Sequence, residues 1–476
     1  MDTKGNGALD GAAREYYGEF LRDYPEYAAT LKLDRVRAEE YPRLDRQGHI
    51  YLDYTGGGLY SDSQIRRHME FLLSSVLGNP HSSNPTSIFT TEKVEQCRKA
   101  VLDFFNAPPE EYVVIFTSNA SQALKLVGEA YPFRKGDRLL LSFDNHNSVL
   151  GIREFDRARG AITEYVPIVP PDLRISDDVL LSYLEKGSRD QNRLFAYPAQ
   201  SNFSGVQHPL EWIDRAKALG WDVLLDAAAF VPTNRLDLQK WRPDYTAVSF
   251  YKIFGYPTGV GALIARRTAL EKLHRPWFAG GTITVASVQA DQYYLAPGAE
   301  GFEDGTPNYT SLTAVCMGIE HIESIGLDLI HTRTECLSHW LITRLLELKH
   351  GNGEPVIRLY GPAERRMRGG TVTINVYDRK GTVVDHQVVE QEANKWKISL
   401  RTGCFCNPGA GELALGLSRD EMIRCMNFPG SRMPLEVFRQ CIDGKSTGAV
   451  RISLGIASNF TDVAQFLRFA GGFRQD

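Results

Sequence analysis

The chain has 476 residues, of which 43% are hydrophobic and 24% are charged, so it can form a large core divided over roughly two or three domains. Its 54 Lys and Arg against 58 Asp and Glu give a formal charge of −4 without a long basic run, so we expect neither nucleic acid nor an anionic membrane as a partner. The N-terminus lacks the apolar core of a secretory signal and no apolar run is long enough to span a bilayer, which predicts a cytoplasmic protein.

The first part of the chain predicts a mostly parallel sheet. Residues 1–50 are rich in aromatic side chains and are expected to pack on the body of the protein. Residues 51–305 repeat a short apolar run, a polar or glycine-bearing turn and a helical pattern, most clearly in EYVVIFTSNASQALKLVGEAY, where a strand ends near Thr117. Apolar runs without alternation, separated by helices, indicate an α/β domain whose sheet is covered on both faces.

From residue 306 the pattern changes to long helices followed by alternating strands such as GGTVTINVYD and AVRISLGI. Residues 306–476 therefore predict a smaller α+β domain, with ASNFTDVAQFLRFAGGF as its last helix.

Polar side chains follow several of the predicted strands, and ligands of parallel sheets bind at the carboxyl ends of the strands. The segment 117–121 begins a helix, where free backbone N–H groups favour a phosphate; helix capping by Ser118 or Asn119 is the alternative. His146 follows LLLSFDN and is suited to stack on a planar ligand or to transfer a proton, although a lone histidine is often only structural.

The next polar residues are Gln200 and Asn202, which suit a ligand oxygen or a plain turn. Asp226 ends the run WDVLLD, where a carboxylate needs a positive partner or caps a helix. Lys252 lies among apolar and aromatic residues that favour its neutral, nucleophilic form, unless its side chain extends to the surface. A phosphate cradle, a ring stacker, a carboxylate and a lysine together indicate pyridoxal 5′-phosphate.

The cysteines form no framework that predicts disulfides, so we expect reduced thiols at all seven positions: Cys97, Cys316, Cys336, Cys404, Cys406, Cys425 and Cys441. Two of them lie one residue apart in LRTGCFCNPGAGE. A zinc site would need a second Cys/His cluster at ligand spacing, which the sequence lacks, so no metal is expected. The remaining alternative is that both thiols are inert in a turn.

Long motifs in this order resemble the class V aminotransferase and cysteine desulfurase family, and their wording is similar to the N-terminal region of molybdenum cofactor sulfurases. The motifs are LGNPHSSNP, YPAQSNFSG, SFYKIFGYPTGVGALIA, FEDGT and RTGCFCNPGA, and the match runs from about Tyr51 to Ser458. Ordinary cysteine desulfurases have a glutamine where this chain has Ala229, so the sulfurases are the nearer resemblance.

The resemblance implies the fold of the fold-type I pyridoxal-phosphate enzymes and a role for each matching residue. Around the cofactor it implies Lys252 as the Schiff-base lysine, Asp226 at the pyridine nitrogen, His146 stacked on the ring, Asn202 with Gln200 at the ring hydroxyl, and Ala120, Ser121 and Ser249 around the phosphate. Thr306 would reach the phosphate of a partner subunit in a homodimer. Arg451, with Arg401 nearby, would pair with the substrate carboxylate, for which a guanidinium has the right bidentate geometry.

In the family, the cysteine at the position of Cys406 takes sulfur from cofactor-bound L-cysteine as a persulfide and leaves L-alanine. A thiolate on a flexible loop near positive groups suits this task, and Cys404 is a candidate relay. Full-length eukaryotic sulfurases continue into a domain that binds the molybdenum cofactor, whereas this sequence stops at Asp476, so a separate acceptor protein or the molybdenum cofactor is the expected recipient.

Two other functions are compatible with the same residues. One is a pathway-specific lyase or another amino-acid-transforming enzyme on the same fold, for which Cys406 would be dispensable. The other is a silent dimeric scaffold, against which the presence of Lys252 and Asp226 argues.

Overall fold

The apolar runs between residues 112 and 266 pair into one seven-stranded sheet in the computed structural model, which describes residues 11–188, 190–428, 430, 432–442 and 447–476. The strand order is β2-β8-β7-β6-β5-β3-β4. Their bounds are β2 Tyr112–Thr117, β3 Arg138–Ser142, β4 Ile162–Val166, β5 Arg193–Pro198, β6 Asp222–Asp226, β7 Tyr245–Ser249 and β8 Gly261–Arg266.

Most of this sheet is parallel. Strands β4, β3, β5, β6 and β7 run in one direction, and β8 is antiparallel to both of its neighbours, β7 and β2. Strands β2, β5 and β7 are buried throughout, as their unbroken apolar sequence requires, whereas the edge strand β4 is only partly buried. The predicted mostly parallel α/β fold is therefore confirmed, and the loops after β3, β5 and β6 meet at one edge of the sheet.

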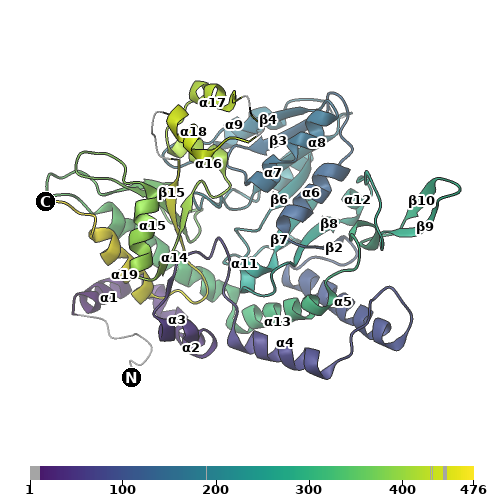
Figure 1. The fold of residues 1–476 in the computed structure, drawn as a ribbon, viewed down its shortest axis with the longest axis horizontal. Coiled ribbons are helices and arrows are strands. Elements are labelled where there is room, and N and C mark those ends of the chain that lie inside the picture. Colours follow the sequence, from purple (N-terminus) through teal and green to yellow (C-terminus); the bar gives the residue numbers. More distant parts are fainter. Residues whose placement is uncertain (1–10, 189, 429, 431, 443–446) are drawn as a thin grey trace.

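Helices cover both faces of the sheet (Figure 1). One apolar cluster packs under α6 Ala120–Ala130, α7 Asn147–Leu150 and α12 Arg267–Leu270. A second cluster on the other face includes α5 Pro85–Phe104, α9 Asp177–Leu184, α10 Trp212–Ala218, α11 Phe250–Phe254 and α13 Tyr309–Ile325. Helices α4 Asp62–Ser74 and α8 Arg153–Ala158 complete the two layers.

A second, smaller sheet is antiparallel, with the order β11-β12-β15-β14. Its strands are β11 Ile357–Tyr360, β12 Thr371–Val376, β14 Arg401–Gly403 and β15 Ala449–Ser453. Its core is shared with α1 Gly11–Asp23, η1 Pro25–Thr30, α14 Leu327–Leu346, α15 His386–Lys395 and α19 Phe460–Gly471.

The N-terminal segment contacts both cores. Phe20 and Tyr27 belong to the core of the smaller sheet, whereas Leu33 of α2 Lys32–Glu40 and Leu44 of α3 Pro42–Gln47 belong to the core of the larger one. The short strands β1 Ile50–Tyr51 and β13 Ile398–Ser399 pair in parallel and join this segment to the smaller unit. The division at residues 50 and 305 stays a prediction, and α13 packs on α4 and α5 of the larger unit.

Three short helices follow the Cys406 turn and lie together at the top of Figure 1: α16 Pro408–Ala414, α17 Arg419–Met426 and α18 Leu435–Cys441. Here the expectation of reduced thiols is wrong for one pair, because Cys425 and Cys441 form a disulfide. Helices α17 and α18 pack around a small apolar cluster of their own. This packing brings the Cα atoms of Cys425 and Cys441 to 5.6 Å, which their spacing in the sequence does not reveal. Cys97, Cys316, Cys336, Cys404 and Cys406 are free thiols.

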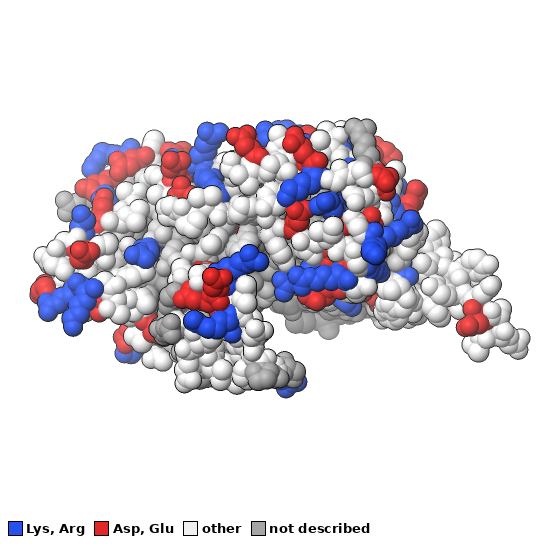
Figure 2. Space-filling view, turned by 90° about the horizontal axis from the view of Figure 1, so that it is seen from above, with Lys and Arg blue, Asp and Glu red and all other residues white. Residues whose placement is uncertain are grey.

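The hairpin β9 Ile283–Ser287 and β10 Gln292–Leu295 projects from the body in Figures 1 and 2 and is almost free of charge. Val288 is 99% exposed and Tyr294 65% exposed at this hairpin. Elsewhere on the face shown in Figure 2, acidic and basic side chains are interspersed. Among the helices of the described residues, none is long and apolar enough to cross a membrane.

Candidate active site

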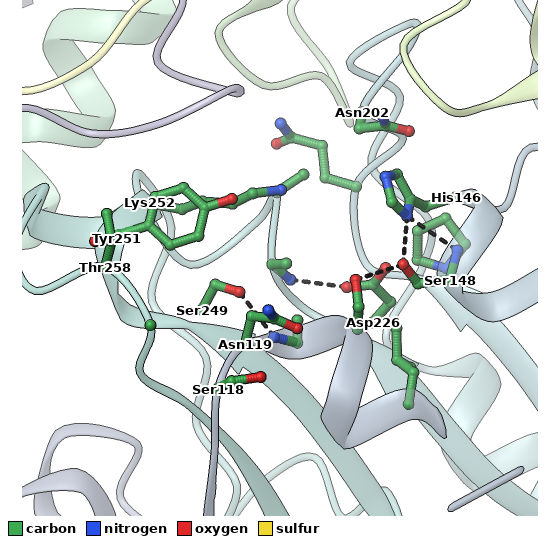
Figure 3. Close-up of a pocket in the computed structure, with 18 residues that line it drawn as sticks. Ser118, Asn119, His146, Ser148, Asn202, Asp226, Ser249, Tyr251, Lys252 and Thr258 are labelled. Atoms are coloured by element: carbon green, nitrogen blue, oxygen red, sulfur yellow. Dashed lines mark hydrogen bonds between the residues drawn. The ribbon is translucent and has the colours of Figure 1, made fainter. Parts of the chain in front are cut away.

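A cavity of about 290 Å³ lies at the carboxyl edge of the large sheet (Figure 3). The larger unit supplies the eight residues that were predicted to bind a cofactor there, and all of them line the cavity: Ala120, Ser121, His146, Gln200, Asn202, Asp226, Ser249 and Lys252. They come from five separate strand ends, which the parallel sheet brings together.

One end of the cavity is built from the N-terminus of α6. Ser249 Oγ accepts a hydrogen bond from Ala120 N (2.8 Å), and Ser121 Oγ lies 2.6 Å from Ser148 Oγ. Asn119 caps the helix by accepting a hydrogen bond from Gln122 N (3.0 Å). The capping alternative is therefore correct for Asn119, and the hydroxyl groups and positive helix end beside it still suit a phosphate.

Lys252 extends across the cavity from α11 (Figure 3). Burial lowers its pKa, an effect that Arg451 reinforces and Asp226 opposes. Asp226, at the end of β6, is buried and accepts a hydrogen bond through Oδ1 from Ala228 N (3.0 Å). A lysine whose neutral form is favoured can attack a carbonyl carbon, and a buried carboxylate can hold a protonated ring nitrogen.

His146 lies across the cavity from Lys252 and is the first residue before α7. Its Nδ1 accepts a hydrogen bond from Ser148 N (3.1 Å), so in the neutral ring the proton is on Nε2. Burial lowers the pKa of His146, the charge of Asp226 opposes this effect, and the charges of Lys252 and Arg451 reinforce it. The net lowering favours the neutral imidazole, whose Nε2–H group can donate a hydrogen bond.

The two candidate carboxylate-binding arginines lie beside the cavity and share Asp53. Arg401 donates from Nη2 to Asp53 Oδ2 (2.6 Å), and Arg451 donates from Nη2 to Asp53 Oδ1 (3.1 Å). The guanidinium of Arg451 also donates to Asn202 O (3.0 Å), and burial lowers its pKa. Neither arginine lines the cavity itself, but the charge of Arg451 acts on both Lys252 and His146.

Cys406 is exposed at the end of a turn that docks on the loops of the cavity. Its carbonyl accepts a hydrogen bond from Asn147 N (2.7 Å), directly after His146. Cys406 also lies among the groups that act electrostatically on Lys252, Arg401 and Arg451. The expected flexible loop is thus a hydrogen-bonded turn on the rim of the cavity.

Thr306 lies outside the cavity of its own chain. It is exposed, and its Oγ1 accepts a hydrogen bond from Asn79 Nδ2 (3.2 Å). A contact between Thr306 and a partner subunit stays a prediction.

Several residues of the site were not singled out from the sequence. Ser148, Tyr251 and Thr258 line the cavity, and Asp53 joins the two arginines. The sequence could have indicated Ser148, Tyr251 and Thr258, since they stand within a few residues of His146 or Lys252. Asp53 stands nearly 350 residues before Arg401, so only the fold shows that they meet.

The cavity fits pyridoxal 5′-phosphate. It offers hydroxyl groups and a helix N-terminus for the phosphate, a buried carboxylate for the ring nitrogen and an imidazole on the opposite wall. Among the described residues, Lys252 makes no hydrogen bond or ion pair through its amine, so this group is available to bind a carbonyl carbon. A partly buried lysine amine without a partner and a buried carboxylate in one cavity are difficult to explain without such a ligand.

Comparison with known proteins agrees with this site. A model of the family "Aminotransferase class-V" matches residues 50–466. Molybdenum cofactor sulfurase from Homo sapiens is 38% identical over 92% of this chain and 51% of the relative, and the protein of that name from Solanum lycopersicum is 37% identical over 95% and 59%. The chain therefore spans between half and three fifths of the length of these curated relatives.

Solved structures show the same fold. The apo cysteine desulfurase from Thermococcus onnurineus has a TM-score of 0.75 and 26% identity, covering 92% of this chain and 97% of that one. The cysteine desulfurase CsdA from Escherichia coli has a TM-score of 0.74 and 19% identity, covering 93% and 98%. A cystine C-S lyase has a TM-score of 0.68 and 18% identity, covering 91% and 100%, so the fold alone does not select the reaction. The fold, the cavity and the family match together show that this chain is a fold-type I, pyridoxal-phosphate-dependent enzyme of the aminotransferase class V family.

Proposed function

We propose that this enzyme is a cysteine desulfurase of the molybdenum cofactor sulfurase type, which converts L-cysteine to L-alanine and keeps the sulfur as a persulfide on Cys406. The observation that carries the proposal is the exposed Cys406 thiol on a turn docked at the rim of the cavity that contains Lys252. The step needs no outside oxidant: the Cys406 thiolate forms an S–S bond to the substrate sulfur, the Cβ–S bond of the substrate breaks, and Cβ keeps the electron pair and takes a proton to become the methyl group of alanine.

Pyridoxal phosphate, when bound, supplies an electron sink for the carbanion at the substrate Cα. Ala120, Ser121 and Ser249 would hold its phosphate, Asp226 its ring nitrogen, and His146, Gln200 and Asn202 would contact its ring. Lys252 would bind its carbonyl carbon and move the substrate proton. The lowered pKa of Lys252 supports this role, since a neutral amine is both a nucleophile and a base.

Arg451, with Arg401, is proposed to hold the carboxylate of the substrate. Their shared contact with Asp53 leaves one excess positive charge, which suits a single carboxylate.

The enzyme is also proposed to act as a homodimer in which Thr306 completes the phosphate site of the partner. Two observations support this: Thr306 is exposed outside its own cavity, and the hairpin β9–β10 that precedes it, with Asp291 as its one charged residue, exposes Val288 and Tyr294. The proposed sulfur recipient is an acceptor protein or the molybdenum cofactor, in line with the names of the curated relatives.

A product assay tests the reaction. Purified enzyme with pyridoxal phosphate, L-cysteine and a reductant is followed for alanine, pyruvate and sulfide, in the wild type, in Cys406→Ala and in the neighbouring control Cys404→Ala. We expect alanine in the wild type and the control and none in Cys406→Ala. Alanine and sulfide from Cys406→Ala would refute the role of Cys406, and pyruvate from the wild type would indicate a lyase.

A further inference from the structure

The turn that carries Cys406 is tied to two loops of the cofactor cavity. Phe405 O accepts a hydrogen bond from Asn202 Nδ2 (2.7 Å), and Cys406 O accepts one from Asn147 N (2.7 Å). The ring of Phe405 lies 5.3 Å from the ring of Phe203 and 4.8 Å from the guanidinium of Arg451. The chain on both sides of the Cys406 thiol is therefore fixed, although the thiol itself is exposed.

Asn407, the next residue, connects these loops. It is fully buried, and its Nδ2 donates both to Asp144 O (2.7 Å) and to Asn202 Oδ1 (3.0 Å). Its Oδ1 accepts from Ala410 N (3.2 Å) and so caps α16. One side chain thus holds the loop before His146, the loop of Asn202 and the helix that follows Cys406.

The turn needs such support because its backbone is unfavourable. Phe405 and Cys406 have φ values of +55° and +56°, a left-handed conformation that costs free energy in a residue with a Cβ atom. Two such residues in succession persist only where the surrounding contacts fix them, and such positions cluster at functional sites. Without the amide of Asn407 we expect the turn to leave this conformation.

We propose that Asn407 is a positioning residue that, together with Asn202, holds the Cys406 turn docked against the cofactor cavity so that the thiol stays within reach of the substrate sulfur. Asn202 lines the cavity and also binds the turn through both ends of its amide, so the turn and the cavity share one side chain. The proposal rests on the proposed role of Cys406 as the sulfur acceptor.

The first test measures amide hydrogen exchange by mass spectrometry in the peptides that carry Asn147 and Asn407, whose backbone N–H groups donate to Cys406 O and Cys404 O. Asn407→Asp keeps an acceptor for Ala410 N but loses the donor to Asp144 O and Asn202 Oδ1, so it removes the contacts that hold the turn and keeps the helix cap. We expect exchange in both peptides to become roughly tenfold faster, the size of effect expected when a buried donor is lost. The matched control is Asn84→Asp, which caps α5 and likewise keeps an acceptor while losing a donor; exchange in the two peptides should then equal that of the wild type.

A second substitution disturbs the contact between the start of α16 and the cavity loop and leaves Asn407 unchanged. A Cβ atom at Gly409 would lie 1.9 Å from Phe143 O, a backbone atom, so Gly409→Ala must move the start of α16 away from the cavity loop. Gly471→Ala is its control, because nothing lies within 4 Å of a Cβ atom there. Gly409→Ala should also speed amide exchange in the two peptides, and Gly471→Ala should not.

Alanine formation by the same variants, assayed with pyridoxal phosphate and L-cysteine, completes the test. Faster amide exchange together with slower alanine formation supports the proposal. Unchanged exchange in both Asn407→Asp and Gly409→Ala overturns it, as does faster exchange with unchanged alanine formation. Amide exchange does not depend on catalysis, so it still shows whether Asn407 holds the turn if Cys406→Ala shows that the proposed reaction is wrong.

Discussion

Asp53 is a single carboxylate that serves two arginines, and removing its charge at constant size tests how the carboxylate-binding side of the site is held together. Each oxygen has its own partner: Oδ2 accepts from Arg401 and Oδ1 from Arg451. In Asp53→Asn one of the two oxygens becomes an NH₂ group. Whichever way the amide turns, one guanidinium then faces a donor in place of an acceptor.

The size of the effect depends mainly on Arg451. The side chain of Arg451 is 4% exposed and that of Asp53 is 10% exposed, so water cannot replace the lost charge, whereas the side chain of Arg401 is 52% exposed and can be solvated. Removing one partner of a buried ion pair costs about 3 to 5 kcal/mol. Since the amide keeps one acceptor, we expect about 3 kcal/mol, at the lower end of that range.

The measurement is urea unfolding of the apo-protein followed by circular dichroism, with the midpoint shift as the readout because a protein of this size can unfold in more than one step. Asp103→Asn is the matched control: its partner Lys99 is 75% exposed and Asp103 itself 60% exposed, so the change should stay below about 0.5 kcal/mol. Equal midpoints for Asp53→Asn and Asp103→Asn would refute the reasoning, because Asp53 would then not compensate a buried charge.

Three further predictions concern groups that line the cavity. The lowered pKa of Lys252 means that the unfolded chain binds this proton more readily than the folded one, so the cost to stability is fully present below the folded pKa and fades as the pH rises toward 10.5. Lys252→Met should therefore raise the urea midpoint of the apo-protein near neutral pH; a lower midpoint would contradict this. His146 likewise has a lowered pKa, so the stability tied to its neutral form falls as the pH drops from 6.5 toward its folded pKa. His146→Asn, which keeps an acceptor for Ser148 N, should lose less stability than the wild type between about pH 8 and 5, and parallel losses would show that His146 does not titrate as expected. Ser249→Ala leaves Ala120 N without its acceptor and should weaken pyridoxal phosphate binding roughly tenfold by equilibrium dialysis, whereas unchanged affinity would remove Ser249 from the phosphate site.

Much of the fold and of the cavity could be predicted from local sequence patterns. Unbroken apolar runs such as Tyr112–Thr117 predicted buried parallel strands, and the polar residues directly after them were placed in one cavity by the geometry of a parallel sheet. His146, Asp226 and Lys252 could be selected because each ends such a strand or lies a few residues beyond it. These are short-range patterns, which a chain expresses without reference to distant residues.

The contacts that join distant segments could not be read in this way. Cys425 and Cys441 are separated by 16 positions that give no sign of a disulfide, and their bond depends on the packing of two short helices. Asp53 meets Arg401 and Arg451 only because β15 crosses beside the N-terminal segment, where Ser453 N binds Leu52 O.

The sequence by itself therefore determined the fold class, the cofactor chemistry and the identity of the candidate nucleophile. Tertiary structure alone decided how Cys406 is presented, since the amides of Asn202 and Asn407 and the left-handed turn between them come together from segments some 200 residues apart. The physical reason is that strand and helix patterns reflect local burial, whereas the partners of a buried polar group depend on which loops the completed core brings into contact.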